Sequence, residues 1–267
     1  MWREKTGNVS GNGRFMQPII FYDFETTDSN PQTCGIHQLS GAVIVEGKVV
    51  ERFNWFVKPK EGCSVSPYAM WLAYKANGFG SVKAMRESDI YEPQDVVYNR
   101  FISLFTKYGG DYRDGHPRYD NRPMLGGFNI HKFDNEVLRQ WMKDNNSPHQ
   151  LGHYIADGSI DLQLICGIVL GRQLRCMNNF KLKEVAWALG VTVEKDKLHS
   201  SDYDTEMCIG IYRALIKKGF IRPMSNEDFF AIHSQEDMDR HNDEHWDEKN
   251  NPDPEKEEWI KNFKEDE

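Results

Sequence analysis

The chain has 267 residues, which fits one large domain or two small ones. Its hydrophobic fraction of 39% and charged fraction of 28% are those of a globular protein. No apolar run approaches the ~20 residues of a membrane-spanning helix, so no membrane contact is expected. The five cysteines are odd in number and form no C-x-x-C pair, which argues against a disulfide framework or a zinc ribbon and predicts reduced thiols in a cytoplasmic setting.

The formal net charge of −8 is distributed unevenly along the chain. Residues 225–267 carry 16 acidic and 5 basic residues, a net charge of −11, which leaves a net charge of +3 on residues 1–224. A mildly basic body is compatible with binding to nucleic acid. We expect 225–267 to form an acidic C-terminal tail with a short docking helix, a candidate site for a protein partner. Residues 1–17 are polar and are expected to form a flexible N-terminal arm.

The first elements expected in the body are three strands. Alternating or continuous apolar residues predict them at 18–24, 38–46 and 48–57. The Glu46-Gly47 pair is a tight-turn signal, so the second and third strands are expected to form a hairpin.

Helical spacing dominates the rest of the body. Ser66-Pro67 combines an N-cap with a proline at the first helical position and predicts a helix as far as about Ala76. Further helices are predicted at 93–108, 134–143, 180–189 and 201–218, a strand at 124–129, and a strand end that becomes a helix at 159–171. Residues 111–123 are expected to be an ordered loop or a small insertion. Three hairpin-linked strands followed by strand–helix alternation predict an α/β or α+β sheet with helices on its faces.

Two acidic residues stand one residue apart at the end of the first strand. Asp23 and Glu25 lie in the sequence FYDFETT, and the alternation of a strand points both to the same face. Two anions placed so close repel each other unless a cation lies between them, and oxygen ligands suit Mg²⁺ or Mn²⁺. On its own, a D-x-E pattern more often marks solvated acids at a strand end.

Two further acidic sites follow along the chain. Asp134 opens a predicted helix shortly after Asn129 ends a strand, where an aspartate is also a common cap. His199 and Asp204 stand five residues apart at the start of the helix predicted at 201–218. The two side chains can converge on one pocket, or serve as a surface histidine and a favourable charge at a helix N-terminus.

Taken together, the order D-x-E, Asp and H-x-x-x-x-D resembles the DnaQ-like 3′–5′ exonucleases, the DEDDh branch of the ribonuclease H-like superfamily. The flanking residues that agree are Thr26, Thr27, Asn129, Phe133 and the Asp161-Leu162 pair ahead of 180–191. The resemblance covers about residues 18–218, and the histidine at position 199 is typical of the DEDDh branch. The chain departs from the family at Asp28, where glycine is common, and at Phe128, where histidine is common.

The resemblance implies a fold, an activity and a set of roles. The fold would be a ribonuclease H-like mixed sheet of three antiparallel strands and then parallel strands, in an exonuclease domain over 18–224 that carries the possible insertion 111–123. The activity would be metal-dependent hydrolysis of phosphodiester bonds at the 3′ end of single-stranded nucleic acid, DNA favoured, with release of nucleoside 5′-monophosphates. Two divalent cations, Mg²⁺ or Mn²⁺, are expected on Asp23, Glu25, Asp134 and Asp204, with His199 as general base. The expected substrate contacts are Thr26, Thr27, Phe24, Asn129 and Phe128.

Three alternatives stay open at this stage. The same chemistry also fits an exoribonuclease that trims RNA 3′ ends, and the same fold fits a catalytically silent binding module. Residues 241–245 match H-x-x-E-H, an inverted zinc-peptidase pattern, but few core residues surround them. The family includes both monomers and homodimers, and the sequence does not choose between them.

Overall fold

The structure is a computed structural model, and it describes residues 18–109, 122–156, 158–171, 179–194, 200–219 and 254–262, with the short pieces 112–113, 116–117, 177, 197–198, 236–237 and 240. Residues 1–17 and most of 225–267 lie outside these ranges, so the arm and tail boundaries stay predictions. None of the helices in the described ranges has the length and apolar character needed to cross a bilayer.

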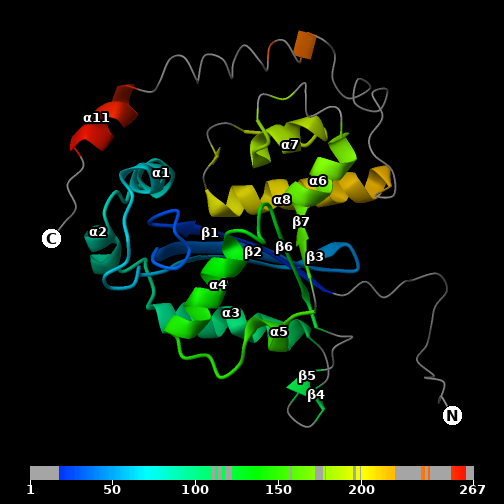
Figure 1. Ribbon diagram of the computed structural model, residues 1–267, viewed down its shortest axis with the longest axis horizontal. Helices are drawn as coiled ribbons and strands as arrows, with labels where there is room; N and C mark the ends of the chain where they lie inside the picture. The colour runs from blue at the N-terminus through cyan, green and yellow to red at the C-terminus, as the bar shows by residue number, and fades with distance from the viewer. Residues whose placement is uncertain are drawn as a thin grey trace.

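A five-stranded mixed sheet forms the centre of the molecule (Figure 1), in the order β3-β2-β1-β6-β7. The strands are β1 (Ile19–Thr26), β2 (Ile36–Val45), β3 (Lys48–Phe56), β6 (Met124–Gly127) and β7 (Ser159–Asp161). The pairs β1–β2 and β2–β3 are antiparallel, whereas β1–β6 and β6–β7 are parallel. The sequence prediction of three antiparallel strands followed by parallel strands is confirmed.

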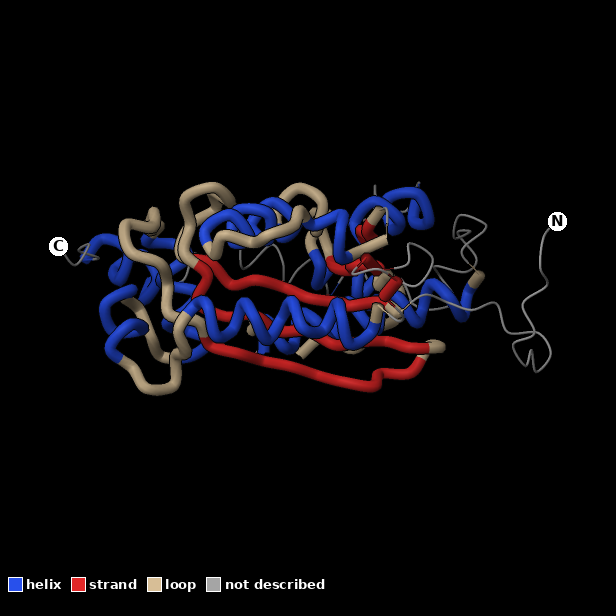
Figure 2. The backbone as a smooth tube through the Cα atoms, turned by 90° about the horizontal axis from the view of Figure 1, so that it is seen from below, coloured by secondary structure: helices blue, strands red, loops and turns tan. Residues whose placement is uncertain are grey.

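Helices cover both faces of the sheet (Figures 1 and 2). One layer holds α3 (Gln94–Tyr108), α4 (Asp134–Asp144) and the short α5 (Leu151–Tyr154). The other holds α6 (Leu162–Leu170), α7 (Leu182–Ala188) and α8 (Ser201–Lys218). The helices predicted at 93–108, 134–143 and 201–218 therefore form with bounds that differ by a residue or less, while α5 was not predicted.

The alternation of side chains along β1 divides the core in two. Ile20, Tyr22 and Phe24 pack with residues of α3 and α4 in one apolar cluster. Ile19 and Phe21 pack with residues of α6, α7 and α8 in the other. Because side chains on a strand alternate between faces, the odd-numbered positions beyond Phe21 point to the α8 side. This pattern places the two acids of the D-x-E motif on that face.

Smaller elements lie beside the sheet. Helix α1 (Pro67–Asn77) ends at Gly78, whose φ of 81° is the left-handed conformation that glycine adopts readily, as the sequence predicted. Helix α2 (Val82–Glu87) follows it and was not predicted. Within 111–123, β4 (Tyr112–Arg113) pairs with β5 (His116–Pro117) as a small antiparallel ribbon.

Helix α11 (Pro254–Asn262) lies against α1, although the two are far apart in sequence (Figure 1). The ring of Trp259 is 5.7 Å from the ring of Trp71 and 6.4 Å from that of Tyr74, measured between centroids. The C-terminal region thus contributes one helix that packs on the body.

Candidate active site

Three carboxylates meet where β1 approaches the first turn of α8. One side-chain oxygen from each of Asp23, Glu25 and Asp204 lies within 4.8 Å of the others, and all three residues are half-buried. Two features of the backbone bring them together. The strand alternation directs Asp23 and Glu25 to the α8 face. The Ser201 hydroxyl, in the first turn of α8, then donates a hydrogen bond to the Asp23 carbonyl at 3.1 Å.

Close packing makes these acids hard to ionise when no cation is present. Burial raises the pKa of Asp23 well above its usual value, and the charges of Asp134, Glu25 and Asp204 raise it further. Burial likewise raises the pKa of Glu25, with added contributions from Asp204 and Asp134. A divalent cation would relieve this repulsion, and carboxylate oxygens are the ligands that hard cations prefer. The donor set therefore fits a metal ion.

Asp134, the third predicted ligand position, is held differently. It begins α4 on the opposite helical layer, and its Oδ1 accepts a hydrogen bond from the Phe24 backbone N–H at 3.1 Å. Burial raises the pKa of Asp134 to about 7, although that hydrogen bond acts in the opposite direction. Asp134 is outside the group of three oxygens within 4.8 Å, but its charge affects the pKa values of Asp23 and Glu25. The structure thus brings three of the four predicted ligands together and places the fourth beside them.

The loop between β6 and α4 is fixed by an acid to which the sequence analysis assigned no role. The carboxylate of Asp161 accepts hydrogen bonds from the backbone N–H groups of Asn129, at 3.1 Å, and His131, at 3.2 Å. It also caps α6 by accepting from Gln163 N at 2.9 Å. Asn129 has a φ of 60°, so its left-handed backbone is held by this contact. The sequence could have indicated the N-cap, because Asp161 stands directly before the apolar helix 162–170. The contact with His131 could not be predicted in this way, because the two residues are 30 positions apart.

Two of the predicted substrate contacts have side chains that are enclosed in the body. The Phe24 ring packs in the core beside Tyr22 and Trp141 and is only 4% exposed, so it has no free face for a nucleobase. The Thr27 side chain is fully buried; its hydroxyl donates to the Ser64 carbonyl at 2.6 Å and accepts from Gly35 N at 2.7 Å. Both side chains hold the end of β1 in place instead.

The other predicted site residues differ in how far the structure describes them. The Thr26 hydroxyl is buried and donates to the Asp28 carbonyl at 2.8 Å. Phe128 is half-buried, with its ring 6.3 Å from that of Phe180. His199 lies outside the described residues, directly before Ser200, the N-cap of α8. Its role as general base therefore stays a prediction, and the 241–245 pattern also lies outside the described ranges.

Comparisons with known proteins agree with this fold. No family model matches the chain. A PolC-type DNA polymerase III of Mycoplasmopsis pulmonis is 23% identical over 224 residues, which are 80% of this chain and 13% of that protein. The structure of E. coli exonuclease I in a complex with single-stranded DNA superposes with a TM-score of 0.57 at 19% identity, over 76% of this chain and 41% of that one. Exonuclease I of Methylocaldum szegediense gives a TM-score of 0.56 at 16% identity, over 76% of this chain and 41% of that one.

The chain spans less than half the length of each of these proteins. At such low identity the structural likeness bears on the fold alone, and it agrees with the strand order and helical layers described above. The chain has the ribonuclease H-like fold of exonuclease I, with a carboxylate cluster at the end of its central strand.

Proposed function

We propose that this protein is a metal-dependent 3′–5′ exonuclease that hydrolyses phosphodiester bonds at the 3′ end of single-stranded DNA and releases nucleoside 5′-monophosphates. The observation that carries the proposal is the meeting of Asp23, Glu25 and Asp204 oxygens within 4.8 Å in the fold of exonuclease I. Structures of exonuclease I with single-stranded DNA oligonucleotides favour DNA over RNA as the first substrate to test.

The four acids would share the work of holding two divalent cations, Mg²⁺ or Mn²⁺. Asp23, Glu25 and Asp204 supply the clustered oxygens, and Asp134 supplies a fourth carboxylate beside them. A pair of such ions, when bound, stabilises charge on both the attacking and the leaving oxygen of the phosphodiester. Together the four carboxylates roughly balance the charge of two dications, so no further protein cation is needed at this point.

The protein's own groups supply orientation and proton transfer. Ser201 fixes the start of α8 against β1, and Asp161 fixes the loop ahead of α4, so both acid-bearing helices begin at defined positions. His199 stands directly before the N-cap of α8, and an imidazole titrates near neutral pH, so it is suited to take the proton of the attacking water.

A gel time course with 5′-labelled DNA and RNA strands of matched sequence tests the proposal. Each strand is incubated with Mg²⁺, with Mn²⁺ and with EDTA, using the native protein and the variants Asp23→Ala and His199→Ala. We expect a metal-dependent ladder that shortens from the 3′ end, no ladder for Asp23→Ala, and a rate lower by about 10²–10⁴ for His199→Ala.

Each alternative has its own pattern in this assay. Faster shortening of the RNA strand would identify an exoribonuclease. Intact strands in every lane, together with retention of the strands on the protein in a binding assay, would identify a non-catalytic binding module. Native activity of Asp23→Ala would overturn the metal assignment.

A further inference from the structure

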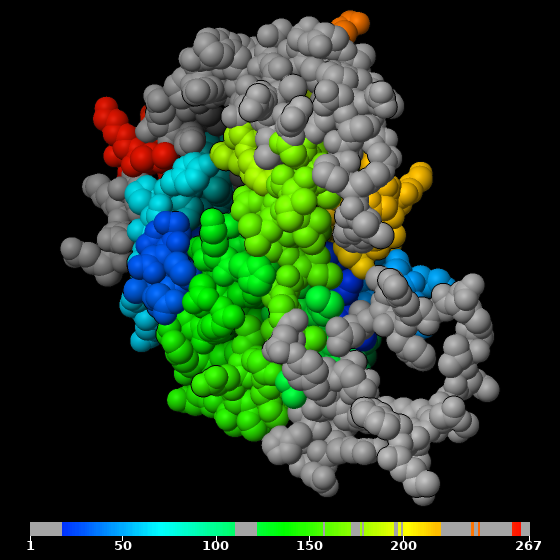
Figure 3. Space-filling model, turned by 45° about the vertical axis from the view of Figure 1, so that its right-hand side comes forward, coloured from blue at the N-terminus to red at the C-terminus, as the bar shows by residue number. Residues whose placement is uncertain are grey.

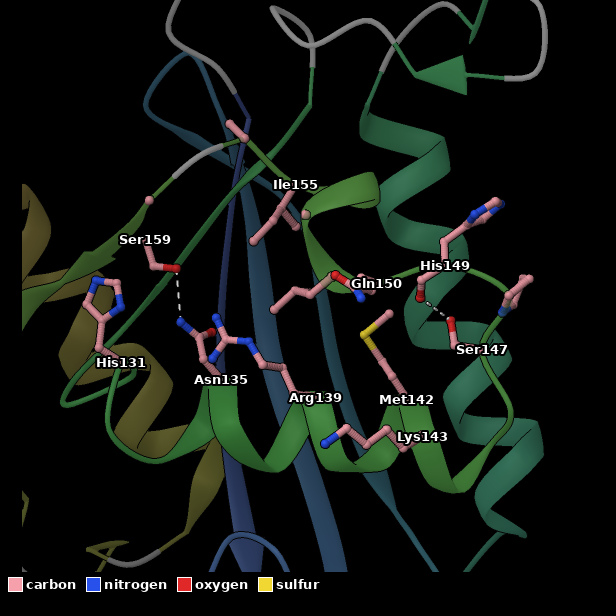
Figure 4. Close-up of a pocket in the computed structure, with 15 residues that line it drawn as sticks. His131, Asn135, Arg139, Met142, Lys143, Ser147, His149, Gln150, Ile155 and Ser159 are labelled. Carbon is pink, nitrogen blue, oxygen red and sulfur yellow. Dashed lines mark hydrogen bonds between the residues drawn. The ribbon is translucent and has the colours of Figure 1, made fainter.

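A cavity of about 700 Å³ opens between α4 and residues of 147–156 and 158–159, which follow it in the chain (Figure 4). Its lining includes Ser159 at the start of β7, which is one of the two edge strands of the sheet. In the space-filling view the surface of residues 124–156, in green, adjoins the yellow-green surface of the residues that follow (Figure 3). The metal-binding carboxylates are not part of its lining, so the cavity is distinct from the site described above.

The inner part of the cavity is apolar. Met142 of α4 and Leu151 of α5 are each 4% exposed, and Ile155 on the opposite wall is nearly as deeply buried. Figure 4 shows Met142 and Ile155 directed into the space between the two walls. These side chains form a closed apolar floor, so a ligand would contact mainly the exposed residues of the two walls.

The rim of the cavity is cationic. Arg139 and Lys143 are exposed, stand four residues apart on α4 and therefore share one face of the helix. His131 and His149 line the same cavity. No acidic side chain of the described residues belongs to the lining. A ligand on this rim needs a negative charge.

The two cations are available to such a ligand. Arg139 forms an ion pair with Glu136 on the surface of α4, a kind of pair that contributes little and that an anion can displace. Lys143 forms no ion pair with any residue that the structure describes. The neighbouring Asp144 is already engaged by Lys60 at 2.8 Å.

The cavity is mechanically connected to the carboxylate cluster. Its wall helix α4 begins with Asp134, and Arg139 and Lys143 lie about 7.5 and 13.5 Å further along the helix axis, from the rise of about 1.5 Å per residue. Asn135 lines the cavity, donates to Ser159 Oγ at 3.0 Å and accepts from the Tyr22 hydroxyl at 2.8 Å. Tyr22 is the β1 residue next to Asp23, so the wall is tied to the strand that carries the acids.

We infer that this cavity is a second nucleotide-binding site, with the phosphate at Arg139 and Lys143 and the base in the space between α4 and residues 147–150. A cavity of about 700 Å³ with cationic walls has room for a phosphate and the sugar and base attached to it, whereas inorganic phosphate alone would leave most of the space unused. The inference rests on the proposed function, because a nuclease is what would bring nucleotides to this cavity. The nucleotide has two sources: a unit of the strand whose 3′ end is being cleaved, or the monophosphate that cleavage releases.

Binding measured in EDTA separates this inference from the proposed function, because no cleavage is needed. Fluorescence anisotropy of labelled oligo(dT) and calorimetry with dTMP, AMP and inorganic phosphate are compared for the native protein and for Arg139→Ala/Lys143→Ala. The matched control is Lys217→Ala/Lys218→Ala, which removes two exposed charges from the other end of α8. All changed side chains are exposed, so thermal unfolding should be unaltered.

Each pattern of results supports or overturns the inference. If the strand occupies the cavity, the cavity variant binds oligo(dT) roughly tenfold more weakly. The slope of log K against log salt concentration should also become shallower by about 1.4, because each of the two lost phosphate contacts contributes about 0.7. If the free product occupies it, the variant loses dTMP and AMP binding while oligo(dT) binding is kept. Unchanged binding of every ligand, equal losses in the control, or binding of inorganic phosphate as tight as that of dTMP would overturn it.

Discussion

Helices α8 and α4 reach the end of β1 from opposite faces of the sheet, and they serve the site in different ways. Helix α8 packs into the core through residues such as Met207, Ile211 and Leu215, and delivers Asp204 into the carboxylate cluster. Helix α4 buries one side in the other core, holds Asp134 on a backbone N–H, and leaves its other side on the cationic cavity. If both proposals hold, metal binding and nucleotide binding are divided between the two helical layers.

The largest effect should come from the acid on α8. Replacing Asp204 with asparagine keeps its shape but removes one charge from the cluster, so several kcal/mol of stabilisation of the reacting oxygens is lost. We expect cleavage to slow by roughly 10³-fold or more. The exposed Asp202 in the same first turn is the matched control, and Asp202→Asn should cleave at nearly the native rate. Equal rates for the two variants in the gel assay would contradict a metal role for Asp204.

The acid on α4 should control how stability depends on pH. An aspartate whose pKa is raised to about 7 in the folded, metal-free protein binds more protons than in the unfolded chain between about pH 4 and pH 7. The free energy of unfolding should therefore fall as the pH rises through this window, by up to about 4 kcal/mol for this one group.

Thermal unfolding in EDTA from pH 4 to pH 8 measures that fall, and Mg²⁺ should remove it at the upper end by neutralising the cluster. In Asp134→Asn the fall should be smaller, because the amide oxygen still accepts from Phe24 N–H but no longer ionises. A melting temperature that rises steadily with pH in EDTA would show that the carboxyls ionise easily in the folded protein.

The smallest effect should come from the link between β1 and α4. The buried Tyr22 hydroxyl donates to Asn135 Oδ1 at 2.8 Å, so Tyr22→Phe leaves a buried oxygen without this donor at a cost of about 1–3 kcal/mol. The matched control is Tyr91→Phe: the Tyr91 hydroxyl is buried and has no hydrogen-bond partner among the described residues. In urea unfolding, Tyr22→Phe should lower the midpoint and Tyr91→Phe should not. Equal midpoints for the two variants would show that the hydrogen bond between Tyr22 and Asn135 does not stabilise the fold.

The local pattern of apolar and polar residues predicted most of the strands and long helices. It also predicted the face of the sheet on which Asp23 and Glu25 lie. The alternation of β1 was enough to place Asp23 and Glu25 together, and Gly78 ended α1 as expected. Helices α2 and α5, with 6 and 4 residues, are too short to show a helical period, so they were missed.

The surroundings of several side chains could not be predicted, because long-range contacts decide them. Phe24 and Thr27 were predicted to touch substrate, but packing across the sheet and hydrogen bonds to distant backbone enclose them. The roles of Asp161 and of the cavity beside α4 depend on residues 20 or more positions apart coming together, which no single stretch of sequence reveals.

The position of β1 also governs how the site is lost. Residues 19–21 of β1 pair with a strand on each side, whereas Asp23 and Glu25 near its carboxyl end pair with β2 alone. Strand segments in the core exchange their amide protons through openings that approach global unfolding, and segments with fewer contacts exchange through smaller openings. Amide protons at 19–21 should consequently exchange more slowly than those around the two acids, so the carboxylate cluster can be disturbed while the rest of the sheet stays folded.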